Sequence, residues 1–318
     1  MNTENEPQGP PPKGPQSRLR QTVSYQVRGI LRRNCDGSFA IQRKREQVLL
    51  KFFKDLRAVG YKVKKVSNVK PKHVEHQVAA WRCSGLAPGT LKNNLSILRW
   101  LCCKIGKSDM LPSNDELGIE RRAYLGEDKA WKDEDCRDLL VAARERNERL
   151  WYQMRLMRAF GLRFKEAALF RPHADDLGTY LHITHGTKGG RERQIPVRTG
   201  EQLALLNEIK AWAPKHESML HWRCSFKDWR AIADADCQAL GLSRETRTNF
   251  HALRHRYAQE RYQELTGLAP PCKLNAEQLA AVTPEMQLQD RWARQTISSE
   301  LGHGRIAICR IYLGPTLR

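Results

Sequence analysis

Apolar residues recur at helical spacing along most of the chain. In residues 46–107 this spacing predicts three helices: one that ends at Gly60, one over residues 73–82, and one that follows Pro88-Gly89-Thr90. The apolar side of the third helix consists of Leu91, Leu95, Leu98, Cys102 and Ile105. Further along, the same spacing predicts helices over residues 133–147, 148–160, 201–212 and 248–265.

Two short segments alternate between apolar and polar residues instead. They are residues 180–183 and 193–197, and the glycine-rich stretch 186–190 lies between them. Alternation on both sides of a tight turn predicts a β-hairpin. The predicted fold is therefore mainly α with one small β-hairpin, an α+β arrangement.

Shifts in composition predict the domain organisation. Residues 1–17 are rich in Pro, Gly, Asn, Gln and Glu, a composition typical of a disordered tail. The other predicted segments are a basic arm or lead-in at 18–45, a helical domain at 46–107, a linker at 108–130 and a larger domain at 131–318.

The chain is strongly basic, with 55 Lys and Arg against 35 Asp and Glu, a formal net charge of +20. The charge is also clustered: residues 46–107 hold 13 basic and 3 acidic side chains, a net of +10. Such clustering favours a polyanionic partner, and the helical domain is interpreted as a clamp on DNA. The basic residues of 18–45 fit either a DNA-contacting arm or a solvated lead-in to the first helix.

Cysteine usage and hydropathy bear on location. The nine cysteines are scattered without a C-x-x-C pair, which favours reduced thiols over a disulfide framework. Apolar runs fall short of a membrane helix, and the first residues lack the apolar core of a signal peptide. We therefore expect a DNA-associated protein of the cytoplasm with no membrane partner.

Six separated residues together suggest attack by a tyrosine hydroxyl on a DNA phosphodiester. Tyr312 follows the string Leu301-Gly302-His303 by nine residues, and a phenol that attacks phosphorus needs cationic neighbours. The candidate catalytic residues are Tyr312, Arg163, Lys188, His251, Arg254 and His303.

Arg163 and Lys188 also have simpler interpretations. Arg163 could form only a salt bridge with Glu166 one turn later, or Glu166 could brace the guanidinium so that its planar fork meets phosphate oxygens. Lys188 lies at the tip of the predicted hairpin, where lysine often serves solubility. Glu166 is thus a candidate supporting residue.

The helix predicted over residues 248–265 carries several further candidates. His251 and Arg254 share one face, which suits an acid or base beside a second phosphate clamp. His251 and His255 have the spacing of a metal pair, but no third ligand is evident, so no metal is expected. Tyr257 and Tyr262 on this helix are rival nucleophiles, although they are better explained as packing residues.

The ordered set resembles the tyrosine recombinase (phage integrase) family. That family carries an arginine in a Gly-Leu-Arg-x-x-Glu context, a hairpin lysine, His-x-x-Arg on a helix, and Leu-Gly-His followed by a tyrosine. The resemblance covers residues 131–318 well. It implies a helical SAM-like core-binding domain in front of the catalytic domain, and the stretch 88–95 looks like a helix that lies on DNA. The DNA-contacting residues implied there are Lys92, Asn93, Arg99 and Lys104.

The resemblance also implies a mechanism. Four protomers would assemble on two double-stranded attachment sites, and Tyr312 would form a 3′-phosphotyrosyl link. Arg163 and Arg254 would hold the non-bridging oxygens, Lys188 would protonate the leaving 5′-oxygen, and His251 would act as general base or acid. His303 would hydrogen-bond the phosphate. No cofactor or metal is implied. The resemblance leaves open an accessory DNA-bending protein and a function in integrating or excising a mobile element.

Two departures from the family pattern stand out. The distance from Arg254 to His303 is long, and residues 268–295 are interpreted as an insertion with a short helix at 275–282, either a contact with a neighbouring protomer or an inert loop. Only residues 313–318 follow Tyr312, too few for a long tail helix. Rival functions are relaxation of DNA by a type IB topoisomerase and a catalytically decayed DNA-binding regulator.

Overall fold

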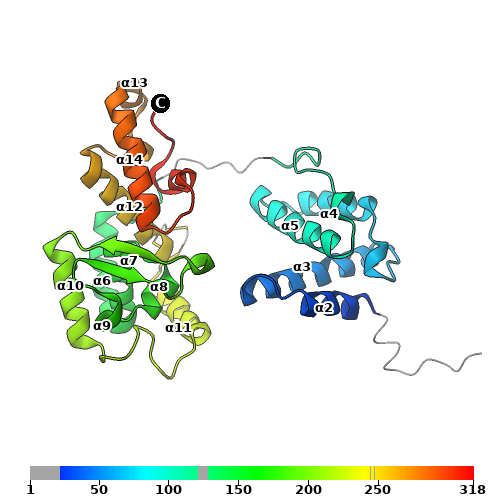
Figure 1. Cartoon of the computed structure of the whole chain (residues 1–318), viewed down its shortest axis with the longest axis horizontal. Helices are drawn as coiled ribbons and strands as arrows, with labels where there is room; N and C mark the ends of the chain where they lie inside the picture. Colours follow the sequence, from blue (N-terminus) through cyan, green and yellow to red (C-terminus); the bar gives the residue numbers. More distant parts are fainter. Residues whose placement is uncertain (1–21, 121–127, 244, 247) are drawn as a thin grey trace, which may run out of the picture. The chain divides into compact units, whose positions relative to one another are not determined.

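The computed structural model describes residues 22–120, 128–243, 245–246 and 248–318, without the side chains of 133–137. The chain divides into two compact units at residues 123 and 124 (Figure 1). Each unit has its own cluster of buried apolar side chains. The expected tail at residues 1–17 lies outside the described residues.

The N-terminal unit is built from helices. These are α2 (Val23–Arg33), α3 (Phe39–Ala58), α4 (Pro71–Cys83) and α5 (Pro88–Lys104), with the short turns η1 (Val66–Asn68) and η2 (Ser108–Met110). The three helices expected between residues 46 and 107 are all present as α3, α4 and α5. Leu91, Leu95 and Leu98 of α5 are buried as the apolar spacing predicts.

The folded part of this unit begins well before the expected boundary at residue 46. Val27 and Ile30 of α2 are buried in the same core as Leu49 of α3, and Ser38 caps α3. The interpretation of residues 18–45 as an arm or lead-in outside the domain is therefore wrong for α2 and the start of α3. Basic side chains dominate the composition of this segment, so the short apolar face of α2 was not recognised from the sequence.

The expected linker is likewise shorter in the structure. Leu111 and Ile119 are buried in the N-terminal core, whereas Ala130 and Trp131 are buried in the C-terminal unit. The expected stretch 108–130 thus belongs to the N-terminal core at Leu111 and Ile119 and to the C-terminal core at Ala130, and residues 121–127 are not described.

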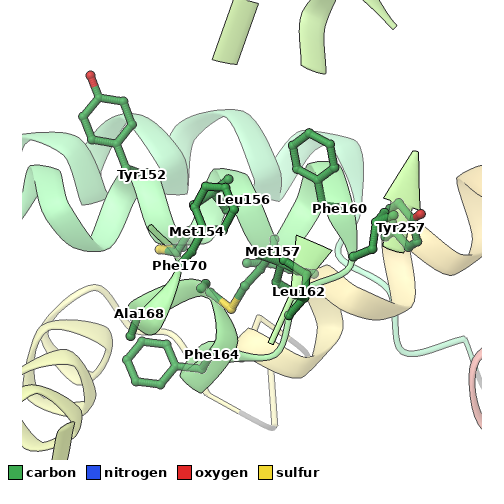
Figure 2. Packing of buried hydrophobic residues seen from close by; sticks show 14 of the residues in the cluster. Tyr152, Met154, Leu156, Met157, Phe160, Leu162, Phe164, Ala168, Phe170 and Tyr257 are labelled. Atoms are coloured by element: carbon green, nitrogen blue, oxygen red, sulfur yellow. The ribbon is translucent and has the colours of Figure 1, made fainter. Parts of the chain in front are cut away.

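The C-terminal unit surrounds the central helix α7 (Glu148–Phe160), which packs against α6, α8 and α12. Figure 2 shows the apolar side chains of α7, α8 and the turn between them gathered in one cluster. The remaining helices and turns are α6 (Asp133–Arg146), α8 (Phe164–Leu169), α9 (Pro172–Asp175), η3 (Lys188–Gly190), α10 (Gly200–Trp212), α11 (Phe226–Ala239), α12 (Phe250–Thr266), η4 (Pro271–Lys273), α13 (Ala276–Ala280), α14 (Pro284–Glu300), η5 (Ile306–Cys309) and α15 (Arg310–Leu313).

The two strands form the expected antiparallel hairpin. Strand β1 (Tyr180–Ile183) pairs with β2 (Arg193–Pro196), and Leu181 lies opposite Ile195 in the register. Both of these apolar residues are buried, as the alternation predicts. The mainly helical α+β fold expected from the sequence is confirmed.

Residues 268–295 are not a single inserted loop. The short helix expected near 275–282 is α13, but α14 then begins at Pro284, with Thr283 as its cap, and continues to Glu300. Ala293 of α14 is fully buried. The interpretation of the whole segment as an insertion is therefore wrong from residue 284 onward. The polar exposed face of α14 gave the sequence its loop-like composition. No helix among the described residues is long and apolar enough to cross a membrane.

Because the two cores share no residue, replacement of Leu95 with alanine should destabilise the N-terminal unit alone. Leu95 is fully buried, so we expect its unit to lose about 2–5 kcal/mol of unfolding free energy. Urea denaturation of the full chain measures this change. Val59→Ala is the control, since Val59 is 55% exposed and its loss should cost under about 0.5 kcal/mol. An equal shift in the C-terminal unit's transition would contradict the separation of the cores.

Candidate active site

Arg163 is placed by a sharp break between two helices. Gly161 ends α7 in the left-handed conformation at φ 61°, and a Cβ there would lie 2.5 Å from Cδ1 of Tyr257. Leu162 and Phe164 are both buried in the core (Figure 2), so the backbone on each side of Arg163 is anchored. Arg163 then begins α8 as its N-cap residue.

Glu166 lies between two arginines. Its carboxylate accepts hydrogen bonds from Arg163 Nη1 at 2.6 Å and from Arg193 Nη1 and Nη2 at 2.9 and 2.7 Å. It also accepts from the Arg163 backbone amide at 2.7 Å. Burial alone would raise the pKa of Glu166, but hydrogen bonding and charge from Arg193, then the charge of Arg163, lower it to about 2. Glu166 is therefore an anion at neutral pH that orients Arg163. This geometry favours the second of the two interpretations of Arg163, in which Glu166 braces the guanidinium.

Arg254 lies on α12 and is only 1% exposed. Its Nη1 donates to the carbonyl oxygen of Gly161 and its Nη2 to that of Leu301, at the ends of α7 and α14. Arg163 Nη2 donates to the same Leu301 oxygen at 3.3 Å. Burial lowers the pKa of Arg254 to about 10, so it remains charged at neutral pH. The negative ends of two helices therefore hold two arginines side by side.

The hydroxyl of Tyr312 meets Arg254 and His303. Arg254 Nε donates to it at 3.2 Å, and His303 Nε2 lies 3.3 Å from it. Tyr312 is 4% exposed. Burial, and then the charges of Arg254 and Arg163, lower the pKa of His303 to about 3, so this ring is neutral at neutral pH. A neutral ring can accept the phenolic proton or donate its own, depending on the tautomer.

Two histidines of α12 also lie close to the tyrosine ring. The ring centroids of His251 and His255 are 5.6 and 4.6 Å from that of Tyr312. His251 is exposed, whereas His255 is buried, and this burial, with the neighbouring His251, lowers the pKa of His255 to about 3. His255 therefore packs against the tyrosine ring as a neutral imidazole. Within the described residues no group of three His, Cys, Asp or Glu could hold a metal ion.

Lys188 is exposed on the loop between β1 and β2. The loop lies against α8, because Gly186 has no side chain: a Cβ there would be 2.8 Å from the carbonyl oxygen of Lys165. The charge of Lys188 contributes to the lowered pKa of His303, after burial and the charges of Arg254, Arg163 and Arg193. A role for Lys188 at this site stays a prediction.

A cavity of about 560 Å³ opens beside this cluster. Arg163, His251 and Arg254 line it. Residues of α11 and of the segment after it, including Arg230 and Ser243, line it as well. An anion that entered this cavity would meet the predicted arginines and His251.

The four predicted DNA-contacting residues lie on α5 of the N-terminal unit. Arg99 is engaged there, since it donates to Asn114 Oδ1 at 2.9 Å and to the Pro112 carbonyl oxygen at 2.6 Å. It therefore holds the segment that follows α5. Asn93 and Lys104 are exposed and eleven residues apart, so they lie on one face of the helix. Lys92 is half-buried, and DNA contact by these residues stays a prediction.

Arg193 is the residue of the cluster that the sequence reasoning missed. It is 7% exposed, and besides holding Glu166 it donates Nε to the Glu300 carbonyl oxygen at 2.7 Å. The strand pattern held a signal for it. Arg193 and Ile195 are two positions apart in β2, so their side chains point to the same, inward face of the strand. A charged residue at an inward strand position indicates a buried partner.

Two family models match parts of the chain. A sequence model described as "Phage integrase, N-terminal" matches residues 21–111, and one described as "Integrase" matches residues 118–260. The second match ends before His303 and Tyr312, so those two residues rest on the geometry above. No curated protein sequence matches significantly.

Solved structures share the fold at low identity. The Tn1549 transposon integrase in complex with circular intermediate DNA is 13% identical, with a TM-score of 0.58 over 92% of this chain and 95% of that one. The XerH site-specific recombinase in a post-cleavage complex is 18% identical, with a TM-score of 0.56 over 91% and 80%. A lambda integrase tetramer bound to a Holliday junction is 13% identical, with a TM-score of 0.54 over 92% and 78%.

Glu166→Gln should change how stability depends on pH. The folded-state pKa of Glu166, about 2, lies below the ordinary 4.5, so its contribution is complete above about pH 4.5 and is lost as the pH falls toward 2. This lowering corresponds to ~3 kcal/mol. Urea denaturation across this pH range should show the wild type losing stability more steeply than the variant. Parallel profiles would contradict the bracing role of Glu166.

Proposed function

The chain belongs to the tyrosine recombinase (phage integrase) family, the enzymes that cleave and rejoin DNA at specific sites, and we propose that Tyr312 is its nucleophile. One observation carries the proposal: the Tyr312 hydroxyl lies within 3.3 Å of both the guanidinium of Arg254 and a ring nitrogen of His303. Both side chains therefore contact the oxygen that would attack phosphorus.

The rival tyrosines are poorly suited to attack. The hydroxyl of Tyr257 donates to Glu300 at 2.7 Å, and burial, then the charge of Glu300, raises its pKa far above the usual range. The hydroxyl of Tyr262 donates to Asp290 at 2.8 Å, and burial and that carboxylate raise its pKa in the same way. Both are packing residues whose hydroxyl groups face anions.

We place the scissile phosphate at the wall of the cavity formed by Arg163, His251 and Arg254. The two arginines stabilise charge on the non-bridging oxygens as phosphorus becomes five-coordinate. Because Glu166 and Leu301 already orient Arg163, little reorganisation is needed when DNA binds. His303 contacts the hydroxyl directly, so it acts on the attacking phenol as well as on the phosphate. His251 is the second acid–base candidate.

The covalent step balances without an external reagent. The hydroxyl of Tyr312 passes its proton to the neutral ring of His303 as its oxygen forms a bond to phosphorus. The bond from phosphorus to the 5′-oxygen breaks, and Lys188 gives that oxygen a proton. The phosphodiester is exchanged for a phosphotyrosyl ester. A 5′-hydroxyl then reverses the reaction and rejoins a strand.

We further propose that four copies act together on two double-stranded attachment sites of a mobile element, in the cytoplasm. The solved tetramer of lambda integrase on a Holliday junction and the DNA complex of the Tn1549 integrase support this assembly. An accessory DNA-bending protein would fit the same scheme. The N-terminal unit, whose segment 46–107 has a net charge of +10, would bind the duplex backbone.

The alternative functions have less support. Both matched sequence models describe integrases, which favours recombination over relaxation of DNA by a type IB topoisomerase. The six candidate side chains are all present, which argues against a decayed regulator. Four of them form one contact network: Arg163 and Arg254 meet at the Leu301 carbonyl oxygen, Arg254 contacts His303, and His303 contacts Tyr312.

Tyr312→Phe should abolish the covalent link to DNA. Wild-type protein incubated with nicked attachment-site DNA should give a band of protein bound to DNA on a denaturing gel, and the variant should give none. Tyr257→Phe is the matched control and should still give the band, because its hydroxyl faces Glu300. An adduct that persists in Tyr312→Phe would contradict the assignment.

A relaxation assay separates recombination from topoisomerase activity. The wild-type protein should leave a supercoiled plasmid without an attachment site unrelaxed, and relaxation of that plasmid would favour the topoisomerase.

Lys188→Ala should slow strand cleavage by about a hundredfold or more, because the leaving 5′-oxygen loses its acid. A substrate with a 5′-phosphorothiolate should restore the rate, since a thiolate leaves without a proton. Single-turnover adduct formation on both substrates measures this difference. Lys165→Ala, a nearby exposed lysine on α8, serves as control. Equal slowing on both substrates would refute the acid role of Lys188.

A further inference from the structure

The backbone that follows Tyr312 is held by buried polar side chains of two other helices. Gln259 of α12 donates to the Tyr312 carbonyl oxygen at 3.3 Å. Arg294 of α14 donates Nη1 to the carbonyl oxygen of Gly314 at 3.2 Å and Nη2 to that of Pro315 at 2.7 Å. The recombination chemistry described above uses neither side chain.

Asp290, one turn before Arg294 on α14, completes this arrangement. Both of its carboxylate oxygens accept from Arg294 Nε at 2.8 Å. It also accepts from the Tyr262 hydroxyl at 2.8 Å and from the Leu317 backbone amide at 3.4 Å. Asp290 is 0% and Arg294 2% exposed. The acid fixes the guanidinium, and both hold the chain after Tyr312.

Stability gives no sufficient reason for a buried ion pair at this place. Removing two charges from water costs about as much as their attraction returns, and an apolar pair of similar size often serves stability equally well. Leu313 and Leu317 already bury apolar surface here, at 0% and 5% exposure. What the ion pair adds is direction: its contacts with residues 314, 315 and 317 can all form in only one register of the segment.

The segment needs such an external anchor. Helix α15 has four residues, Arg310–Leu313, which is too short for a helix to be stable by itself. Tyr312 lies on this helix, so the position of its hydroxyl follows the position of the whole segment. The contacts of that hydroxyl with Arg254 and His303 span 3.2 and 3.3 Å and would be lost after a shift of one residue.

We propose that Asp290 and Arg294 are a positioning pair for the nucleophile: they fix residues 314–317 on α14 of the same chain and thereby place the Tyr312 hydroxyl against Arg254 and His303. The proposal rests on Tyr312 being the nucleophile. The pair does not touch the reacting atoms. It acts through the backbone and gives the short segment after Tyr312 a function inside its own subunit.

Arg294→Lys tests the pair. Lysine keeps the charge but has no planar fork to hold Asp290 and two carbonyl oxygens together. With saturating attachment-site DNA, single-turnover adduct formation should slow at least about tenfold, since a misplacement of about 1 Å can cost a hundredfold. DNA affinity should stay within about twofold, because Arg294 is buried away from solvent. Arg291→Lys, the same change at an exposed position of α14, should leave both quantities unchanged.

Backbone hydrogen exchange gives a readout that does not depend on activity. In Arg294→Lys, amides of residues 310–317 should exchange faster, while those of α12 should keep their protection. Wild-type cleavage and unchanged exchange in the variant would overturn the proposal. If the wild type forms no adduct, the proposed function fails, but the exchange experiment still decides whether the pair anchors the segment.

A second variant covers the case in which Arg294→Lys unfolds. Deletion of residues 315–318 removes the Pro315 carbonyl and the Leu317 amide but leaves Asp290 paired with Arg294. The buried acid and base stay paired, so the fold should persist. Adduct formation should again slow at least about tenfold with DNA affinity unchanged. Cleavage at the wild-type rate would show that these contacts do not position Tyr312.

Discussion

The central constraint on this protein is that two arginine side chains must lie side by side inside the larger unit. Arg163 and Arg254 both donate to the carbonyl oxygen of Leu301, and Arg254 donates also to that of Gly161. These carbonyls end α14 and α7, where helices present unsatisfied acceptors and negative partial charge. Glu166 supplies the full negative charge that the carbonyls lack. The packing of α7, α8, α12 and α14 therefore also determines the electrostatics of the site.

This arrangement explains why a large domain is needed to hold so few charged side chains together. The arginines contribute charge in a region from which water is largely excluded, where electrostatic interactions are stronger. Such charges remain only where the surrounding groups compensate them, and Arg193 and Glu300 extend the compensation to β2 and the end of α14. The same surroundings keep His303 neutral beside Tyr312. The protein thus prepares its charge distribution before DNA binds.

The sequence predicted individual helices and strands better than the boundaries of the larger segments. The helical spacing and the strand alternation predicted the hairpin and several helices of both units, since apolar periodicity reports directly which face is buried. Composition was a poorer guide. Basic residues concealed α2, and the polar face of α14 looked like an inserted loop. In both cases a few apolar residues on one face, Val27 and Ile30 or Ala293 and Ile297, outweigh many exposed polar ones.

By itself, the sequence determined the ordered residue types: Arg163 with Glu166, Lys188, His251 with Arg254, and His303 before Tyr312. Local spacing can establish these, because each short string lies within one turn or helix. Only the tertiary structure decided which partners neutralise them. Arg193 lies 27 residues from Glu166, and Arg294 lies 20 from Gly314. Contacts across such distances depend on how α14 and β2 pack, and no local pattern in the chain encodes that packing.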